Sequence, residues 1–175
     1  LGRPFVSGPL RHPGDPPLVA RCDLNESAYP PLPTVATALA EQARRAHRYP
    51  EFLPDTLRAA IATHLGVDPA AVTVGAGGTA VAFTILQDCL TRTRTRRPRI
   101  STPVPTFDGF AILARMLGAT IDPSPLTPSG IPDLDALLAG IGPDTAAVIL
   151  CSPHNPTGAI IGNAELRAFV RAVPA

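Results

Sequence analysis

The 175-residue chain is 45% hydrophobic and 17% charged, with a formal net charge of +1, which fits one globular domain or most of one. No stretch approaches the ~20 apolar residues that span a bilayer, and the first residues lack a secretion-signal pattern, so we expect a soluble cytoplasmic protein that does not bind membranes. Cys22, Cys89 and Cys151 lack metal-binding spacing, and we interpret them as buried small apolar residues, without a disulfide framework or a metal.

The first third of the chain contains an extended segment followed by helices. Residues 1–17 are rich in proline and glycine and have no periodic apolar pattern, so we predict an extended arm without a core of its own. Apolar residues at helical spacing predict a helix over residues 34–47, which Pro50 ends. A second helix is predicted over residues 55–65, and Gly66 closes it.

Beyond residue 70 the pattern changes to short β-rich runs that alternate with helices. The predicted strands cover residues 72–74, 100–102 and 146–151, and the predicted helices cover residues 79–90, 107–117, 133–141 and 163–172. Gly118 suits a left-handed cap after one helix, and Asn163 suits the N-cap of another. This alternation is typical of an α/β fold with a mostly parallel sheet sandwiched by helices. Because such a sheet normally continues further, we interpret the chain as the N-terminal part of a longer protein.

A glycine-rich loop, Gly75-Ala76-Gly77-Gly78-Thr79-Ala80, lies between a predicted strand and a predicted helix. Glycine lets the backbone approach an anion closely, and a helix start offers unpaired N–H groups, so we predict phosphate binding there. The loop also matches the loose dinucleotide pattern, but that interpretation requires an acidic residue about 20 positions further on, and residues 93–102 contain none. The structural alternative is a glycine turn that tightens strand-to-helix packing.

Four further motifs accompany the glycine loop: Asn25-Glu26, Arg48-Tyr49-Pro50, Pro105-Thr106-Phe107 and His154-Asn155-Pro156-Thr157-Gly158. In this order they resemble the N-terminal half of the fold-type-I pyridoxal-phosphate-dependent aminotransferases of class I/II, and most of all the histidinol-phosphate aminotransferases. The resemblance runs from about Cys22 to the end of the chain. The resemblance implies that the chain forms an incomplete large domain of this transferase fold. It also implies that the cofactor is pyridoxal 5'-phosphate.

The resemblance assigns cofactor-binding roles to five residues. It implies that Gly77, Gly78 and Thr79 bind the cofactor phosphate. It implies also that Phe107 stacks on the pyridine ring and that Asn155 donates a hydrogen bond to the ring hydroxyl oxygen. Two structural alternatives stay open: Phe107 as a core residue, and Asn155 as an ordinary turn residue before a proline.

The resemblance also implies roles for residues nearer the N-terminus. Tyr49 is similar to the residue that reaches the phosphate of the neighbouring subunit's cofactor, which implies a homodimer. Asn25 and Glu26 resemble part of the segment that closes over the substrate, which makes them substrate-binding candidates. The alternative for Tyr49 is packing on the surface beside Pro50. His154, next to the predicted site, we interpret as a turn neighbour rather than a base.

All fifteen basic residues of the chain are arginine, so the chain contains no lysine. An aminotransferase of this family needs a lysine amine that holds the cofactor, an acid paired with the pyridine nitrogen and an arginine for the substrate carboxylate, and in the family these follow the Asn-Pro-Thr-Gly turn. Arginine cannot replace the lysine, because a guanidinium stays protonated at neutral pH. The family also usually has an acidic residue where this chain has Thr79-Ala80. We therefore expect this segment alone to be inactive.

We predict transamination between an amino donor and a keto acid in amino-acid biosynthesis, on an amino acid or an amino-phosphate of the histidinol-phosphate type. Residues 1–33 are the predicted arm and small-domain segment, and residues 34–175 the N-terminal part of the cofactor-binding large domain. The alternatives are a decarboxylase or lyase of the same fold, or a non-catalytic remnant that binds phosphate or a partner subunit. Residues 91–99 hold five arginines but no aromatic residue, so we expect a solvated loop and no nucleic-acid binding.

Overall fold

The computed structural model describes residues 24–27 and 29–174, and the chain divides into two units between Phe52 and Leu53. In the first unit, helix α1 (Pro33–Ala43) has no buried residue. A proline at the first position of a helix is favourable, because the N–H that it lacks would have no partner there. The helix ends four residues before the predicted end at His47. The predicted arm, residues 1–17, lies outside the described residues.

The second unit contains the sheet and the other helices. Its elements, in chain order, are α2 (Asp55–Leu65), the 3-10 helix η1 (Pro69–Ala71), α3 (Gly77–Arg92), β1 (Arg99–Pro103), α4 (Gly109–Met116), β2 (Thr120–Ser124), α5 (Leu134–Gly140), β3 (Thr145–Val148) and α6 (Asn163–Ala172). Gly66 and Gly118 follow α2 and α4 with φ of +67° and +75°, as predicted for left-handed caps. Both ends of α2 agree with the prediction.

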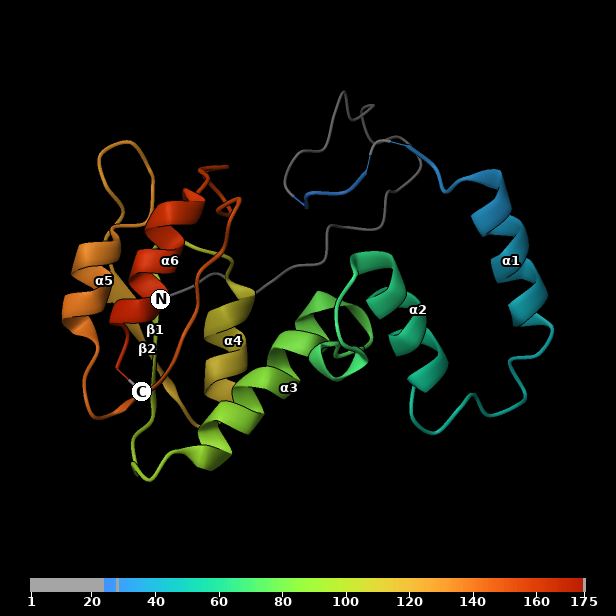
Figure 1. Ribbon diagram of the computed structural model, residues 1–175, viewed down its shortest axis with the longest axis horizontal. Helices are drawn as coiled ribbons and strands as arrows, with labels where there is room; N and C mark the ends of the chain where they lie inside the picture. Colours follow the sequence, from blue (N-terminus) through green and yellow to red (C-terminus); the bar gives the residue numbers. More distant parts are fainter. Residues whose placement is uncertain (1–23, 28, 175) are drawn as a thin grey trace, which may run out of the picture. The chain divides into compact units, whose positions relative to one another are not determined.

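The three strands form one parallel sheet in the order β2-β1-β3. Ile100, the second residue of β1, pairs with Ile121 of β2 and Ala147 of β3. Helices α3 and α4 pack on one face of the sheet, and α5 packs against β1 and β2 with α6 beside it. Figure 1 shows α4 and α5 on opposite sides of the strands. The predicted α/β fold with a parallel sheet between helices is confirmed.

The core between the sheet and helices α3 and α4 is made of aliphatic residues. Ile100 is fully buried and contacts a cluster formed by Leu86 of α3, Leu113 and Ala114 of α4, and Ala119. Because each fully buried Leu or Ile side chain contributes about 1.5–3 kcal/mol, this cluster is what holds α3 and α4 on the sheet. It fixes the loops at the ends of the strands in place.

Two local predictions are wrong and one strand was not predicted, each for a physical reason. Residues 72–74 form no strand, because no strand of the described residues lies beside them to accept their hydrogen bonds. β2 was not predicted, because its sequence contains Asp122 and Pro123. A proline is tolerated there, since among the described residues β2 pairs with β1 on one side only. Asn163 is the first helical residue of α6 rather than its cap; the Gly162 N–H donates to the Glu165 carboxylate at 3.1 Å.

Two cysteines lie within the described residues, and Cys22 lies outside them. Cys89 and Cys151 are half-buried thiols, so the prediction that they are buried is wrong. The described part of the chain has no helix with the length and hydrophobicity needed to cross a membrane. Residues 24–27 and 29–174 likewise contain no cluster of His, Cys, Asp and Glu suited to a metal ion.

Candidate functional site

Two of the predicted site residues, Phe107 and Asn155, lie in loops that the sheet brings together. Phe107 follows the carboxyl end of β1, and Asn155 follows the carboxyl end of β3. Because β1 and β3 are neighbours and parallel, both loops leave the same edge of the sheet. Ligands of open α/β sheets bind at this edge.

The glycine loop forms the start of helix α3. Gly77 has φ of +82°, a left-handed conformation that glycine adopts without strain, and its N–H donates to the Gly75 carbonyl oxygen at 2.8 Å. Ala76 at the N-cap has no side chain that could accept a hydrogen bond. Consequently, the N–H groups of Gly78 and Thr79 have no acceptor among the described residues. The helix start is therefore uncapped and carries two free donors.

The other end of α3 shows which way the helix points. Thr95, three residues after α3, donates a hydrogen bond from its hydroxyl to Asp144, which directly precedes β3. Helix α3 therefore ends near the starts of the strands, and its uncapped start points away from them. A Cβ at Gly78 would meet no atom within 4 Å, and Thr79 is exposed, so the approach to this helix start is open.

Phe107 stands at the edge of the sheet with 38% of its surface exposed. Its ring meets the ring of Phe110 edge-on, with centroids 5.4 Å apart and planes at 89°. The ring also lies over Gly109, where an added Cβ would come within 2.1 Å of Phe107 Cε1. Phe107, Thr106 and their neighbours line a cavity of about 160 Å³. The side chain is thus too exposed for a core residue and is held with a flat apolar surface available.

Asn155 lies in a turn that is fixed on both sides. Its side chain is half-buried and has no hydrogen-bond partner within the described ranges. The preceding His154 is only 2% exposed, and its Nε2 lies 2.9 Å from the Pro105 carbonyl oxygen. On the other side, the Thr157 hydroxyl donates to the Gly130 carbonyl oxygen at 2.8 Å. The turn therefore presents a free amide from a rigid position.

The sequence analysis did not identify the structural roles of His154 and Thr157, whose side chains fix the turn around Asn155. Both bind to residues far away in the chain, at separations of 49 and 27 positions, and no local pattern indicates such a contact. The only available signal was their position beside Asn155. Our interpretation of His154 as a turn neighbour is incomplete, because a turn residue on the surface would not be buried.

Three predicted residues belong to the first unit. Tyr49 is fully exposed, and Asn25 and Glu26 are exposed as well. Asn25 has φ of +53°, the left-handed region that asparagine tolerates better than most residues. In the second unit, Phe107 and Asn155 lie at one edge of the sheet, and Gly77, Gly78 and Thr79 lie at the start of α3. The cofactor and substrate roles of all eight residues stay predictions.

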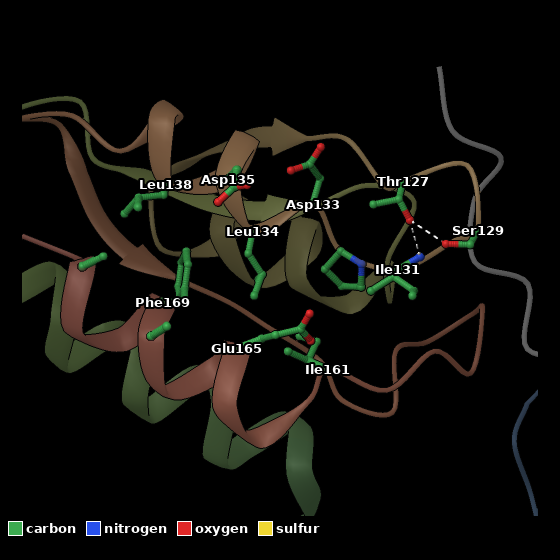
Figure 2. Close-up of a pocket in the computed structure, with 13 residues that line it drawn as sticks. Thr127, Ser129, Ile131, Asp133, Leu134, Asp135, Leu138, Ile161, Glu165 and Phe169 are labelled. Carbon is green, nitrogen blue, oxygen red and sulfur yellow. Dashed lines mark hydrogen bonds between the residues drawn. The ribbon is translucent and has the colours of Figure 1, made fainter.

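Two larger hollows lie elsewhere in the second unit. One of about 500 Å³ is bounded by α5, α6 and residues 127–133 (Figure 2), and one of about 830 Å³ lies along β3 and α6. Neither is lined by a predicted cofactor residue. Two of the three carboxylates at the first hollow have structural partners: Asp133 accepts from the Ala136 N–H at 2.9 Å and Glu165 from the Gly162 N–H. The predicted cofactor residues therefore lie outside both of these hollows.

Comparison with known proteins defines the class to which this site belongs. The model of the family "Aminotransferase class I and II" matches residues 22–175, and the chain belongs to this family. The chain is similar to the aromatic amino acid aminotransferases of Corynebacterium diphtheriae, with 37% identity over 86% of the chain and 43% of the relative, and of Nocardia farcinica, with 38% identity over 86% of the chain and 41% of the relative. The family predicted from the five motifs is thereby confirmed.

A solved structure agrees with this assignment. The chain is similar to the histidinol-phosphate aminotransferase of Sinorhizobium meliloti in complex with pyridoxal-5'-phosphate, with a TM-score of 0.76 and 27% identity over 86% of the chain and 40% of that protein. The chain spans less than half the length of the curated relatives that it matches.

Proposed function

We propose that the edge of the sheet holds pyridoxal 5'-phosphate and that the protein containing these residues is an aminotransferase that moves an amino group from an amino donor to a keto acid. The single observation that carries this proposal is the uncapped start of α3, with free N–H groups at Gly78 and Thr79. It supports a phosphate site, and the family makes pyridoxal phosphate the phosphate compound to expect.

The residues at the helix start fit a phosphate group. Two backbone N–H groups and the Thr79 hydroxyl supply three donors, and the absence of a side chain at Gly77 and Gly78 leaves room for phosphate oxygens. The partial positive charge at the N-terminus of a helix also favours an anion, here without an acidic side chain in the first turn to compete.

The residues of the two loops fit the ring of the cofactor. The exposed face of Phe107 would orient the flat pyridine ring and exclude water from it, and the Asn155 amide would donate to the ring hydroxyl oxygen. When bound, the cofactor supplies an electron sink for the carbanion chemistry of amino acids. These residues of the chain bind and orient it; none of them is placed to move a proton.

The absence of lysine limits what residues 1–175 do on their own. Every basic residue is arginine, and a guanidinium is neither a nucleophile nor a proton carrier at neutral pH. We propose that the segment alone binds the cofactor non-covalently and does not turn over. The proposed roles of Tyr49 in a homodimer, and of Asn25 and Glu26 at the substrate, apply to the whole protein, as does a cytoplasmic location.

Two substrate classes have specific support. The relatives at 37–38% identity are named aromatic amino acid aminotransferases, whereas the solved structure at 27% identity is a histidinol-phosphate aminotransferase. The higher identity favours an aromatic amino acid as the amino donor, and histidinol phosphate is the second candidate. The rates of amino transfer to 2-oxoglutarate from tyrosine, phenylalanine and histidinol phosphate, measured on the natural polypeptide, distinguish the two.

The test of the site is a spectrophotometric titration of the natural polypeptide with pyridoxal phosphate. We expect Thr79→Val to weaken binding about tenfold, the effect of removing one hydrogen bond to a charged group. Thr84→Val is the matched control, because Thr84 lies exposed on the same helix and its hydroxyl donates only to the Ala80 carbonyl oxygen. Equal affinities of the two variants would refute the proposed phosphate site.

A further inference from the structure

His154 is buried in a way that a turn residue does not require. Its side chain is 2% exposed, and its ring Nε2 lies 2.9 Å from the carbonyl oxygen of Pro105, 49 positions earlier in the chain. A carbonyl oxygen only accepts hydrogen bonds, so Nε2 must carry the proton that is shared. This contact sets the tautomer of the ring.

The second ring nitrogen makes no hydrogen bond of its own within the described residues. Nδ1 is buried and has no partner within residues 24–27 and 29–174. The contact of Nε2 with Pro105 is therefore the polar contact that the ring makes within the described residues.

The bond connects the two loops that carry the ring-binding residues. Pro105 stands two positions before Phe107, and His154 directly precedes Asn155. The backbone of His154 is itself anchored: its N–H donates to Ala159 at 2.7 Å, and its carbonyl oxygen accepts from Gly158 at 2.6 Å. The ring therefore spans from a fixed turn to the loop after β1.

We propose that His154 is a positioning residue, whose Nε2–H bond to Pro105 sets the placement of Phe107 relative to Asn155. The inference rests on the proposed function only for the roles of those two residues. An aliphatic side chain would fill the same space without leaving an unpaired ring nitrogen buried. The hydrogen bond to Pro105 is thus the feature that explains a histidine here.

The test compares three variants of the natural polypeptide. His154→Gln keeps an N–H donor near the position of Nε2, His154→Asn ends near Nδ1 and cannot reach Pro105, and His154→Leu fills the space without a donor. We expect the Asn and Leu variants to bind pyridoxal phosphate about fivefold more weakly, and the Gln variant to stay within about twofold of the unaltered protein. Leu137→Val, at a residue of α5 that is 1% exposed, controls for a general loss of packing.

A second measurement needs no cofactor. Nitrogen NMR of the labelled imidazole is expected to show a protonated Nε2. The backbone amide resonances of residues 106–108 should shift in the Asn variant but not in the Gln variant. A bare Nε2, or Asn and Gln variants that shift these amides equally, would overturn the inference. If the unaltered protein does not bind pyridoxal phosphate, the proposed function fails, and the NMR result still decides the role of His154.

Discussion

Among the single residues of the candidate site, the contact between Phe107 and Gly109 determines whether the Phe107 ring offers its flat face to a ligand. A Cβ at residue 109 would come within 2.1 Å of Phe107 Cε1 and 2.5 Å of Phe107 Cζ. Phe107 is 38% exposed, so its ring has solvent to move into. A side chain at residue 109 would therefore displace the ring rather than strain the backbone.

We predict that Gly109→Ala lowers the affinity for pyridoxal phosphate about two- to tenfold, the range for losing one aromatic contact. The free energy of unfolding should change by no more than about 1 kcal/mol, because alanine is favoured over glycine in a helix. Gly140→Ala is the matched control: Gly140 lies at the end of α5, where a Cβ would meet nothing within 4 Å. Titration and urea unfolding of both variants check the prediction, and an unchanged affinity of Gly109→Ala would contradict it.

The residues of the site differ in how well the sequence predicts them. Phe107, Asn155 and the glycine loop stand in motifs, and the structure puts them at a sheet edge and a helix start, as a parallel α/β fold requires. His154 was not predicted as a buried residue, because its burial depends on Pro105, which is distant in the chain. Contacts of this kind appear only when the fold is known.

At the scale of elements, Arg58 attaches α2 to the segment that follows it. Its Nε donates to the Val72 carbonyl oxygen at 3.1 Å, and a terminal nitrogen donates to that of Pro69 at 3.0 Å. The other terminal nitrogen binds Asp55 at 3.1 Å. The planar guanidinium makes the three bonds in different directions, which a lysine ammonium cannot do from one position.

We predict that Arg58→Lys lowers the free energy of unfolding by about 1–2 kcal/mol, because two carbonyl groups lose a charged donor. Arg92→Lys is the control, since Arg92 is 77% exposed and pairs only with Asp88; its effect should be below about 0.5 kcal/mol. Urea unfolding measures both values. An Arg58→Lys variant as stable as Arg92→Lys would show that these hydrogen bonds do not hold α2.

The helices and strands also show which local sequence signals suffice to predict an element. The bounds of α2 were predicted correctly because Gly66 marks its end with a left-handed residue. A strand, by contrast, exists only with a partner, and residues 72–74 have none within the described chain even though their composition favours one. β2 has a partner in β1 despite its aspartate and proline. In both segments, the presence or absence of a neighbouring strand, rather than the amino-acid composition, determined whether a strand formed.

At the scale of the whole molecule, β3 leaves an edge of the sheet without a strand in the described residues. A hollow of about 830 Å³ lies along this strand and α6, lined mostly by apolar residues such as Leu150, Leu166 and Val170. Val170 is 62% exposed. An open edge beside an apolar surface favours association between chains.

We predict that residues 1–175, produced alone, associate in a concentration-dependent way and that Val170→Lys reduces this association. Ile160→Lys is the control, because Ile160 is 70% exposed but does not line the hollow. Sedimentation velocity over a range of concentrations measures the effect. A monomer with a sharp, reversible unfolding transition that is independent of concentration would contradict the prediction.

Two hydrogen bonds fix the Asn155 turn, one from the His154 ring to Pro105 and one from the Thr157 hydroxyl to Gly130. They connect this turn with the loop after β1 and the loop after β2. The Thr157 hydroxyl donates to the Gly130 carbonyl oxygen. Residues 127–131 form a tight loop, because Thr127 and Ile131 are joined by two hydrogen bonds, one of which Figure 2 shows. We predict that a ligand bound to Asn155 further reduces the motion of residues 127–131, because the Thr157 hydroxyl joins the two segments. Amide hydrogen exchange of residues 127–131 should then be slower when the ligand is bound than when it is absent. These residues would become less mobile although they do not contact the ligand themselves.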